Sequence, residues 1–479
     1  MRRAGLNRAL AAAPWAALDA VTTALYGVLF LFVVGRLIGP AELGLASSAL
    51  AFVLLVEAVS SAGLQEAVIR LPGADTRRTD ATHALAVALS LAAMPIAWLA
   101  AWRYGVATGE PRLLPLVAFA SVMLPLNAIA CVPTALLVRK MRGRQLLLRP
   151  ITGKIAGIGV LIGLAAAGAR ASAIVAASVA TSLGGAVALY AATTRRPRLR
   201  WDRRVAAAQL RFGLLAGVDG LFWMVGLRLF TLAFAAAFGM RALGQLQLAL
   251  RLVEEVSRLL QSIVMRYALA LFAELRRAKA DVAPTLLRAT GLLNAAAVPA
   301  FVALACIGDL VVVATFGGPW SQAGGAVRLL AAASVLTFAR MLVTPALKAI
   351  GRPDRVALAA SVNFASALAV IASLRVVEAP VAVALWAARE LLALAIWAVL
   401  ARHHLGVSLG DGARALAPSW AAGGVMALLL AALRHVLEPG PLVAVGALAY
   451  GALFWSGKRV PLAGLLGAAG GGRWRRSTS

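Results

Sequence analysis

The 479-residue sequence has little cysteine, histidine or acidic charge, and each scarcity argues against a class of function. Its two cysteines, Cys131 and Cys306, both fall in predicted membrane segments, so the sequence predicts neither a disulfide framework nor a CxxC pair. The four histidines are scattered over predicted loops and span ends and indicate no metal site. A GxxxxGK[ST] phosphate-binding loop is missing too, so nothing points to an ATPase within the chain.

Apolar residues, in contrast, make up 62% of the chain, and the mean hydropathy is +0.87. A membrane-spanning helix needs about 20 mostly apolar residues, because the hydrocarbon core is about 30 Å thick. We therefore expect an all-α, polytopic membrane bundle of about fourteen spans. In the first half we place them at residues 14–37, 43–66, 82–102, 113–138, 151–169 and 172–193. In the second half we place them at 212–239, 243–272, 289–316, 325–347, 356–377, 380–401, 416–434 and 440–457.

Lys and Arg collect in every second connection between these spans. With a cytoplasmic N-terminus, the inner segments hold 32 basic residues and the outer segments 7. The positive-inside rule then places both termini in the cytoplasm. The net charge of +28 lies mostly in short loops between apolar helices, where membrane orientation and anionic lipid explain it, so we expect no nucleic-acid partner.

A repeat divides the chain into two halves. Gly39, Leu43 and Gly44 lie between the first two spans, and the same residue types return 200 positions later as Gly239, Leu243 and Gly244. This spacing predicts two parallel six-helix lobes with two helices appended. The expected units are residues 1–194 and 212–401 for the lobes, 195–211 for a basic cytoplasmic linker, 402–457 for helices 13 and 14, and 458–479 for a basic tail.

Ionisable residues inside spans are costly unless they face a partner or a wet cavity, so each is a functional candidate. The eighth span is the richest: a helical spacing of three or four places its polar residues on one face. These are Gln247, Arg251, Glu254, Glu255, Arg258, Gln261 and Arg266, and the first, second and seventh spans add Asp19, Glu57, Asp219 and Arg228. Two interpretations stay open: the stripe lines a cavity, or it only holds helices together through ion pairs.

Several short segments resemble the Wzx-type polysaccharide flippases, which belong to the multidrug/oligosaccharidyl-lipid/polysaccharide exporter superfamily. The segments are Arg36 to Gly44, Gly63 to Arg70, Leu243-Gly244 leading into Arg251-Leu252, Gly317 to Ala323, and the Gly351-Arg352 turn. The resemblance implies two lobes around a central cavity that passes undecaprenyl-diphosphate-linked sugars across the bacterial inner membrane. The chain departs from the family pattern in its seventh span, where Arg228 is the charged residue near the position of a frequent acidic one.

Guanidinium groups bind phosphate oxygens in bidentate fashion, so we assign Arg228, Arg251, Arg258 and Arg266 to the diphosphate headgroup. Gln247 and Gln261 are candidates for sugar hydroxyls. The acidic residues Asp19, Glu57, Asp219, Glu254 and Glu255 are candidates for ion coupling or ion pairing. Because no bond is made or broken, we expect a transporter rather than an enzyme, with no cofactor.

Two rival functions remain. A cation-coupled multidrug exporter of the same superfamily would use acidic residues such as Asp19, Glu57 and Asp219 to bind organic cations. A membrane glycosyltransferase or polymer ligase needs a large outer loop with catalytic residues, and every predicted outer loop is short. For the flippase, the expected partners are the lipid-linked oligosaccharide, membrane lipids, and the polymerase and glycosyltransferases of the same pathway.

Overall fold

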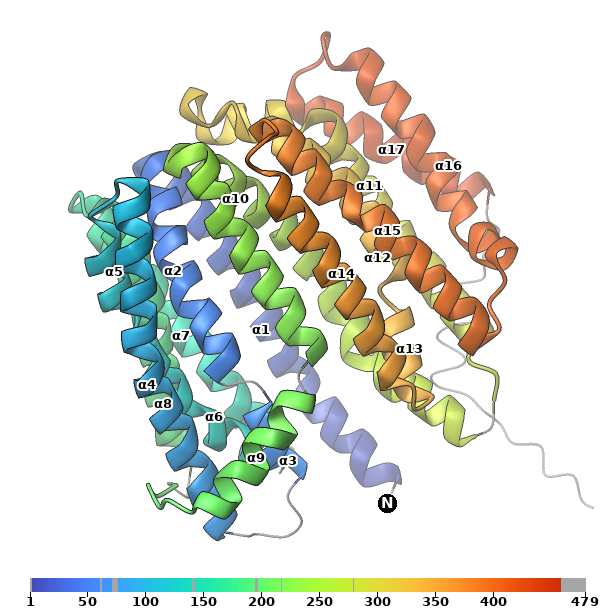
Figure 1. Ribbon diagram of the computed structural model, residues 1–479. Coiled ribbons are helices and arrows are strands. Elements are labelled where there is room, and N and C mark those ends of the chain that lie inside the picture. The colour runs from blue at the N-terminus through green and yellow to red at the C-terminus, as the bar shows by residue number, and fades with distance from the viewer. Residues whose placement is uncertain are drawn as a thin grey trace, which may run out of the picture.

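The computed structural model describes residues 2–60, 63–70, 76–139, 143–193, 197–216, 218–278 and 280–457, and every regular element in them is helical (Figure 1). The first half holds α1 (Arg2–Leu37), α2 (Pro40–Ser60), α3 (Leu64–Arg70), α4 (Thr76–Thr108), α5 (Leu113–Ala120), α6 (Met123–Arg139), α7 (Gly143–Ala166), α8 (Arg170–Ala192) and α9 (Arg203–Ala216). The second half holds α10 (Val218–Arg277), α11 (Ala283–Phe316), the 3-10 turn η1 (Gly318–Trp320), α12 (Ala323–Arg340), α13 (Val343–Ala349), α14 (Pro353–Ser373), α15 (Ala379–Leu405), α16 (Leu409–Leu433) and α17 (Pro439–Gly457).

Hydropathy predicted this bundle correctly. Eleven helical stretches are long and apolar enough to cross a membrane, and the shorter apolar helices 21–37 and 439–454 add two more. One of the eleven, residues 220–261, covers most of both the seventh and the eighth predicted span. All fourteen predicted spans therefore correspond to helical segments.

Spans seven and eight form the two arms of a helical hairpin within α10. The arms, 218–238 and 240–277, meet at Gly239, whose φ of 84° is a conformation that favours glycine. The Gln247 side-chain amide reaches back across the turn to the Thr231 hydroxyl at 3.4 Å. A backbone conformation that only glycine adopts readily thus reverses the chain in a single residue.

The fourth span of each lobe is broken at an equivalent place. In the first lobe, α5 gives way to α6 at Ser121, four residues before Pro125; in the second, α12 gives way to α13 at Met341, four residues before Pro345. Proline has no N–H to bond with the carbonyl four residues earlier, so the helix breaks there. This shared break supports the two-lobe repeat independently of the glycine motif.

The two lobes stand side by side, with α2, α4 and α5 to α8 on one side and α10 to α15 on the other (Figure 1). Helices α16 and α17 are appended to the second lobe, where α16 and α17 pack against α11. Helix α1 contacts α7 of the first lobe as well as α10 and α11 of the second. Helix α10 therefore lies where α1, the first lobe and the rest of the second lobe meet.

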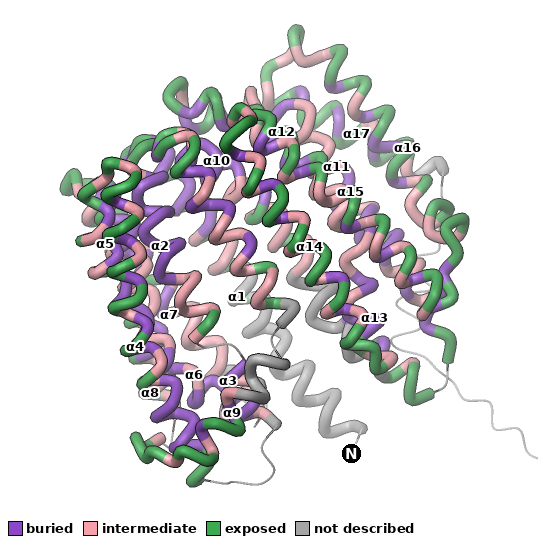
Figure 2. The backbone as a smooth tube through the Cα atoms, viewed as in Figure 1, coloured by how far each residue is buried: buried purple, intermediate pink, exposed green. Residues whose placement is uncertain are grey.

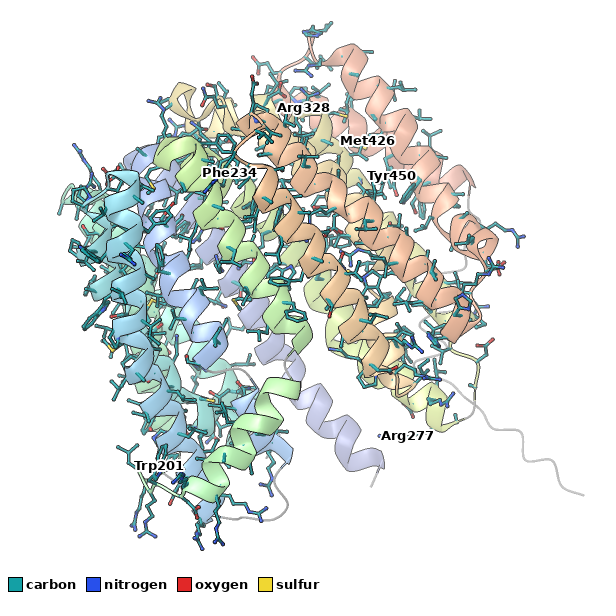
Figure 3. All side chains as sticks on the ribbon, viewed as in Figure 1. Trp201, Phe234, Arg277, Arg328, Met426 and Tyr450 are labelled. Carbon is teal, nitrogen blue, oxygen red and sulfur yellow. The ribbon has the colours of Figure 1, made fainter. Side chains whose placement is uncertain are left out.

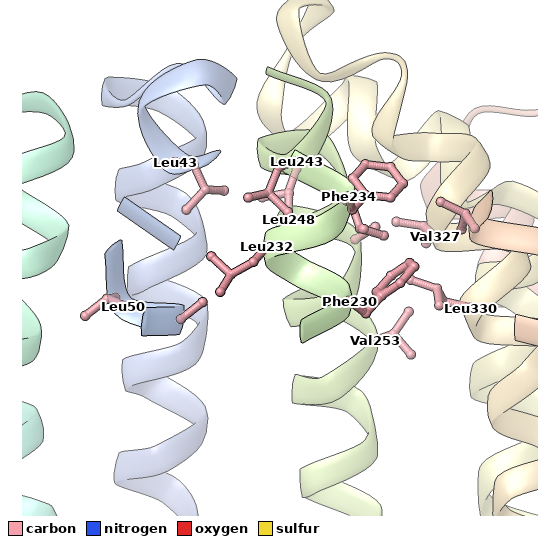
Figure 4. Close-up of a cluster of buried hydrophobic side chains, with 14 of the residues drawn as sticks. Leu43, Leu50, Phe230, Leu232, Phe234, Leu243, Leu248, Val253, Val327 and Leu330 are labelled. Atoms are coloured by element: carbon pink, nitrogen blue, oxygen red, sulfur yellow. The ribbon is translucent and has the colours of Figure 1, made fainter. Parts of the chain in front are cut away.

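The lobes touch most closely along a seam between α2 and α10, where buried residues are concentrated (Figure 2). A methyl group on Gly44 would meet the Met240 carbonyl oxygen at 1.8 Å, and one on Gly244 would meet the Pro40 carbonyl oxygen at 1.7 Å. Leu43 and Leu243 fill the space beside these glycines (Figure 4). The repeated motif is thus the reciprocal contact between the two lobes, which explains why small residues are required there.

Three hydrogen bonds join the lobes at the end of the bundle that is predicted to face outward. The Trp320 indole N–H donates to the Gly35 carbonyl at 2.8 Å, and the Tyr104 hydroxyl donates to the Leu232 carbonyl at 2.7 Å. Beside them, the Arg36 guanidinium donates to the Thr315 carbonyl at 2.9 Å. The structure is therefore held together at this end.

The predicted linker 195–211 contains a helix that the hydropathy profile did not separate from the seventh span. Residues 203–216 form α9, whose side chains Ala206 and Leu210 pack against α3, α4 and α6. The seventh span therefore begins at Val218 rather than at residue 212. The proposed domain boundaries stay predictions, and the tail 458–479 lies outside the described residues.

Candidate functional site

The candidate site is a charged cluster on the second arm of α10. Arg258 lies 2.7 Å from a Glu255 carboxylate oxygen and 3.8 Å from one of Glu254, so both carboxylates on its own helix face it. The Arg258 and Glu254 side chains are about half exposed, at 41% and 57%, whereas Glu255 is only 14% exposed. Glu255 is thus the inner partner of this pair.

Helix α1 covers the buried part of the cluster. The Arg251 guanidinium carbon lies 4.1 Å from the centre of the Phe30 ring, a cation–π geometry. One turn away, Gly27 lets α1 approach so closely that a methyl group there would meet the Glu255 carboxylate at 2.3 Å. Lys154 of α7 bonds to the Thr23 hydroxyl on the same helix. Arg251 therefore faces α1 and not the surrounding lipid.

A second part of the cluster comes from the first lobe. The Asn127 amide of α6 donates to Glu57 of α2 at 2.9 Å, and the Arg149 guanidinium of α7 donates to the Asn127 oxygen at 3.4 Å and to the Thr134 hydroxyl at 3.0 Å. Burying a carboxylate and a guanidinium together is tolerable because each has polar partners. Three helices are thus tied together around Glu57.

Arg228, on the first arm of α10, connects the two parts. It is in electrostatic range of Glu57 in the first lobe and of Arg251 and Glu254 on the second arm. Its Nε atom is buried without a hydrogen-bond partner among the described residues. Among the described side chains of the cluster, Arg149, Lys154, Arg228, Arg251 and Arg258 outnumber Glu57, Glu254 and Glu255, so this described part carries a net positive charge.

The structure brings together Glu57, Arg228, Arg251, Glu254, Glu255 and Arg258 of the predicted residues. Gln247 is different: it is 8% exposed and hydrogen-bonded within the α10 hairpin, so its side chain is part of the packing. Gln261 is half-buried at the far end of the stripe. The side chains of Asp19, Asp219 and Arg266 lie outside the described residues.

Sequence reasoning missed Arg149 and Asn127. It counted Arg149 with the basic loop residues, yet α7 begins at Gly143 and Arg149 lies inside it. The three leucines 146–148 before Arg149 were the available signal, because they show that the apolar run starts earlier. A polar residue such as Asn127 in the middle of an apolar helix was a second signal.

The second lobe carries its own ion network. Arg340 at the end of α12 lies 2.5 Å from Glu390 of α15, which also accepts from the Thr337 hydroxyl at 2.9 Å. The neighbouring Arg389 stacks over Trp386 at 4.1 Å and donates to the Asn363 carbonyl of α14 at 3.1 Å. These bonds join α12, α14 and α15 within the lobe.

The predicted central cavity stays a prediction. A surface hollow of about 500 Å³ lies elsewhere, between α5 and α8, beside Arg112 and Arg170. Among the described residues, no group of three His, Cys, Asp or Glu side chains is arranged to hold a metal ion. What the cluster offers chemically is therefore guanidinium and carboxylate groups between two lobes.

Comparison with known proteins places this fold in a class. The structure is similar to that of a lipid II flippase, MurJ, in an inward closed conformation, with a TM-score of 0.72 and 11% identity over 91% of this chain and 97% of that one. It is also similar to an inward-facing multidrug resistance MATE family transporter of the MOP superfamily, with a TM-score of 0.61 and 15% identity over 81% of this chain and 94% of that one. The fold is therefore the two-lobed helical fold of these membrane transporters.

The sequence itself gives the family. Residues 33–324, more than half of the chain, match the family described as polysaccharide biosynthesis protein. The chain belongs to this family, which confirms the resemblance drawn from its short motifs. A comparison with curated proteins finds no match.

Proposed function

We propose that the protein moves an undecaprenyl-diphosphate-linked oligosaccharide across the bacterial inner membrane by alternating access between its lobes. The observation that carries this proposal is the net positive cluster of Arg228, Arg251 and Arg258 between the lobes, in a chain of the polysaccharide biosynthesis family. An anionic diphosphate needs such a site to leave the headgroup region. The lipid II flippase MurJ, whose fold is similar, is named for a lipid substrate.

The chemistry of the cluster allows a phosphate to replace a carboxylate as the partner of an arginine. A diphosphate oxygen that reaches Arg258 replaces the Glu255 carboxylate, and Arg251 and Arg228 supply further N–H donors nearby. Arginine stays charged in a buried site, so no proton need be supplied for binding. Since the substrate is carried without a bond being made or broken, we propose a transporter and not an enzyme.

The multidrug exporter is the weaker alternative. Glu57 interacts with Arg149 and Arg228, Glu255 is paired with Arg258, and Glu254 lies near the same arginine. Carboxylates that already have guanidinium partners are poor sites for an organic cation. On the side predicted to be cytoplasmic, the glycosyltransferases that build the substrate are the expected partners, and a polymerase is expected on the other side.

The test is transport by the full-length protein in proteoliposomes that contain the lipid-linked oligosaccharide, measured by the protection of its sugar from added glycosidase. Arg251→Gln and Arg258→Gln should each lower the rate about tenfold or more, because glutamine keeps some hydrogen bonding and removes the charge. Arg258→Lys should be partly active. The matched control is Arg328→Gln, which removes a half-exposed arginine of α12 whose acidic neighbour is Asp309 and not a residue of the cluster.

The competing interpretation is that Arg258 only holds helices together. In that case Arg258→Gln lowers stability, and Glu255→Gln combined with Arg258→Gln restores both stability and transport, because removing both halves of a partly buried pair costs less than removing one. Normal transport by the stably folded Arg251→Gln and Arg258→Gln proteins would contradict the headgroup assignment.

A further inference from the structure

Two large apolar side chains are solvent-exposed at the end of the bundle that is predicted to be cytoplasmic. Leu199 is 68% exposed and Trp201 is 60% exposed, on the segment that leads into α9. Figure 3 shows Trp201 at the peripheral lower edge of the bundle, with Arg277 at the same end. Leaving such side chains in water is unfavourable, so their exposure calls for something that covers them.

Hydrogen bonds and an ion pair fix the position of the segment that leads into α9. The Arg198 backbone N–H donates to Asp80 at 3.2 Å, and Arg77 of α4 lies 2.7 Å from Asp202. Asp202 also accepts from the backbone N–H groups of Arg204 and Val205, so it caps the start of α9. Two carboxylates thus fix the backbone on either side of Leu199 and Trp201.

The protein's own core does not take up these two side chains. The apolar face of α9 is already used, since Ala206 and Leu210 pack with Leu64, Leu85 and Ala86. Around Leu199 and Trp201 the exposed residues are instead basic: Arg77, Arg198, Arg200, Arg203 and Arg204. The surface therefore combines two exposed apolar side chains with five exposed arginines.

We propose that this surface, which we term the linker patch (Arg77, Arg198–Arg204), is a binding site for anionic phospholipid of the leaflet on the predicted cytoplasmic side. Guanidinium groups bind the phosphate, while Trp201 and Leu199 insert at the level of the headgroups, where tryptophan is most favourable. The five exposed arginines are complementary to an anionic lipid surface and not to a neutral one. The site anchors the connection between the two lobes to the membrane.

The first test measures which lipids the intact chain retains. Full-length protein is equilibrated with mixed micelles of phosphatidylglycerol and phosphatidylcholine, and bound lipid is counted by native mass spectrometry. Replacing Arg198, Arg200 and Arg203 together by Gln should reduce the preference for phosphatidylglycerol about tenfold or more, because each arginine that binds an anionic headgroup directly contributes about fivefold. The matched control replaces Arg352, Arg402 and Arg414, three exposed arginines on the same predicted side, and should retain the preference.

The second test reads the site directly and does not depend on the charge variants folding. The tryptophan emission lost in Trp201→Phe is the emission of Trp201, and it is compared in nanodiscs with brominated phosphatidylglycerol or brominated phosphatidylcholine. Brominated phosphatidylglycerol should quench most of it, and brominated phosphatidylcholine much less. No quenching by either lipid, or equal quenching by both, overturns the proposal; binding of an acidic protein instead would leave both lipid measurements unchanged between variants and likewise overturn it.

Discussion

Arg258 is paired with Glu255, whose carboxylate also lies against Gly27 of the neighbouring helix α1. Gly27 therefore affects the geometry of this ion pair. Glu255 lies between Arg258 and the backbone of Gly27 in α1. At this scale the identity of one small residue decides how near α1 comes to the charged face of α10. The same residue determines where the Glu255 carboxylate rests.

A methyl group on Gly27 should therefore act through Glu255. We expect Gly27→Ala to lower thermal stability by an amount equivalent to about 1–2 kcal/mol, because the carboxylate must leave its position against α1. In a Glu255→Ala background the same change should cost almost nothing. Melting of the four purified proteins of this cycle measures the coupling, and equal costs in both backgrounds would contradict it.

The Arg340–Glu390 pair allows a second prediction about single residues. Glu390→Gln keeps an amide oxygen as an acceptor but removes the negative charge that pairs with Arg340 in a partly buried place, so stability should fall by about 1–3 kcal/mol. Changing both Arg340 and Glu390 to methionine should cost less than the single change. Arg352→Gln serves as the control in the same melting assay: its contact with Asp354 spans 4.0 Å between half-exposed side chains, and its loss should be nearly neutral.

Much of this residue-scale picture was readable in the sequence, because buried charges are rare enough in an apolar helix to be noticed one by one. Arg251 and Arg258 were found in this way, and both lie in the cluster. The roles of Gly27 and Asn127 were not readable, since each depends on which helix lies opposite. Helical spacing gives the face of one helix but says nothing about its neighbour.

At the scale of the elements, the α2–α10 seam predicts an effect of two glycines far apart in the sequence. Gly44→Ala and Gly244→Ala each place a methyl group against a backbone carbonyl that cannot move aside as a side chain can. We expect a loss of about 1–3 kcal/mol in stability for each, with transport reduced as well. The control Gly159→Ala has no atom within 4 Å of the added methyl group and should be neutral or slightly stabilising in the same assays.

Helix α9 should respond to acid through Asp202. Hydrogen bonds from the Val205 and Arg204 backbones and the contact with Arg77 hold the pKa of this carboxyl below its usual range. A lowered pKa means that the capping is complete above the ordinary Asp value of about 3.9 and is lost as the pH falls through the still lower folded value. Amide exchange in α9 should therefore quicken below about pH 4, relative to the α8 control, and Asp202→Asn should remove this pH dependence.

The elements divide into those that hydropathy predicts and those that backbone geometry decides. All fourteen spans were predictable, because each must satisfy its own backbone hydrogen bonds within an apolar run. The turn at Gly239 falls at the predicted boundary between spans seven and eight. The breaks before Pro125 and Pro345 lie inside predicted spans and leave the average hydropathy unchanged, so no window over the sequence reports them. Helix α9 was hidden because its three arginines and Gln209 offset its apolar residues in the average.

For the whole molecule, the charge imbalance predicts the orientation in the membrane. Reporter fusions at Gly109, Gly318 and Pro439 should report the outer side, and fusions at Arg200 and Asp281 the cytoplasmic side. If the fusions report the expected sides in the first half of the chain and the opposite sides in the second half, the hairpin at Gly239 does not cross the membrane twice. A fusion at Gly239 itself, expected outside, distinguishes these cases.

The glycine contacts of the α2–α10 seam have a thermodynamic consequence for the proposed alternating access between the lobes. Interlocked side chains must find new rotamers when two surfaces separate, whereas Gly44 and Gly244 meet the carbonyls of Met240 and Pro40, which lie within helices. Parting the glycine contacts strands few polar groups, and the apolar side chains exposed beside them include Leu43 and Leu243. For the proposed alternating access, we expect a free-energy gap between closed and opened lobes of the few kcal/mol that a ligand's differential affinity can overcome. A close approach of two backbones at Gly44 and Gly244 thus suits the reversible separation of lobes that the proposed transport requires.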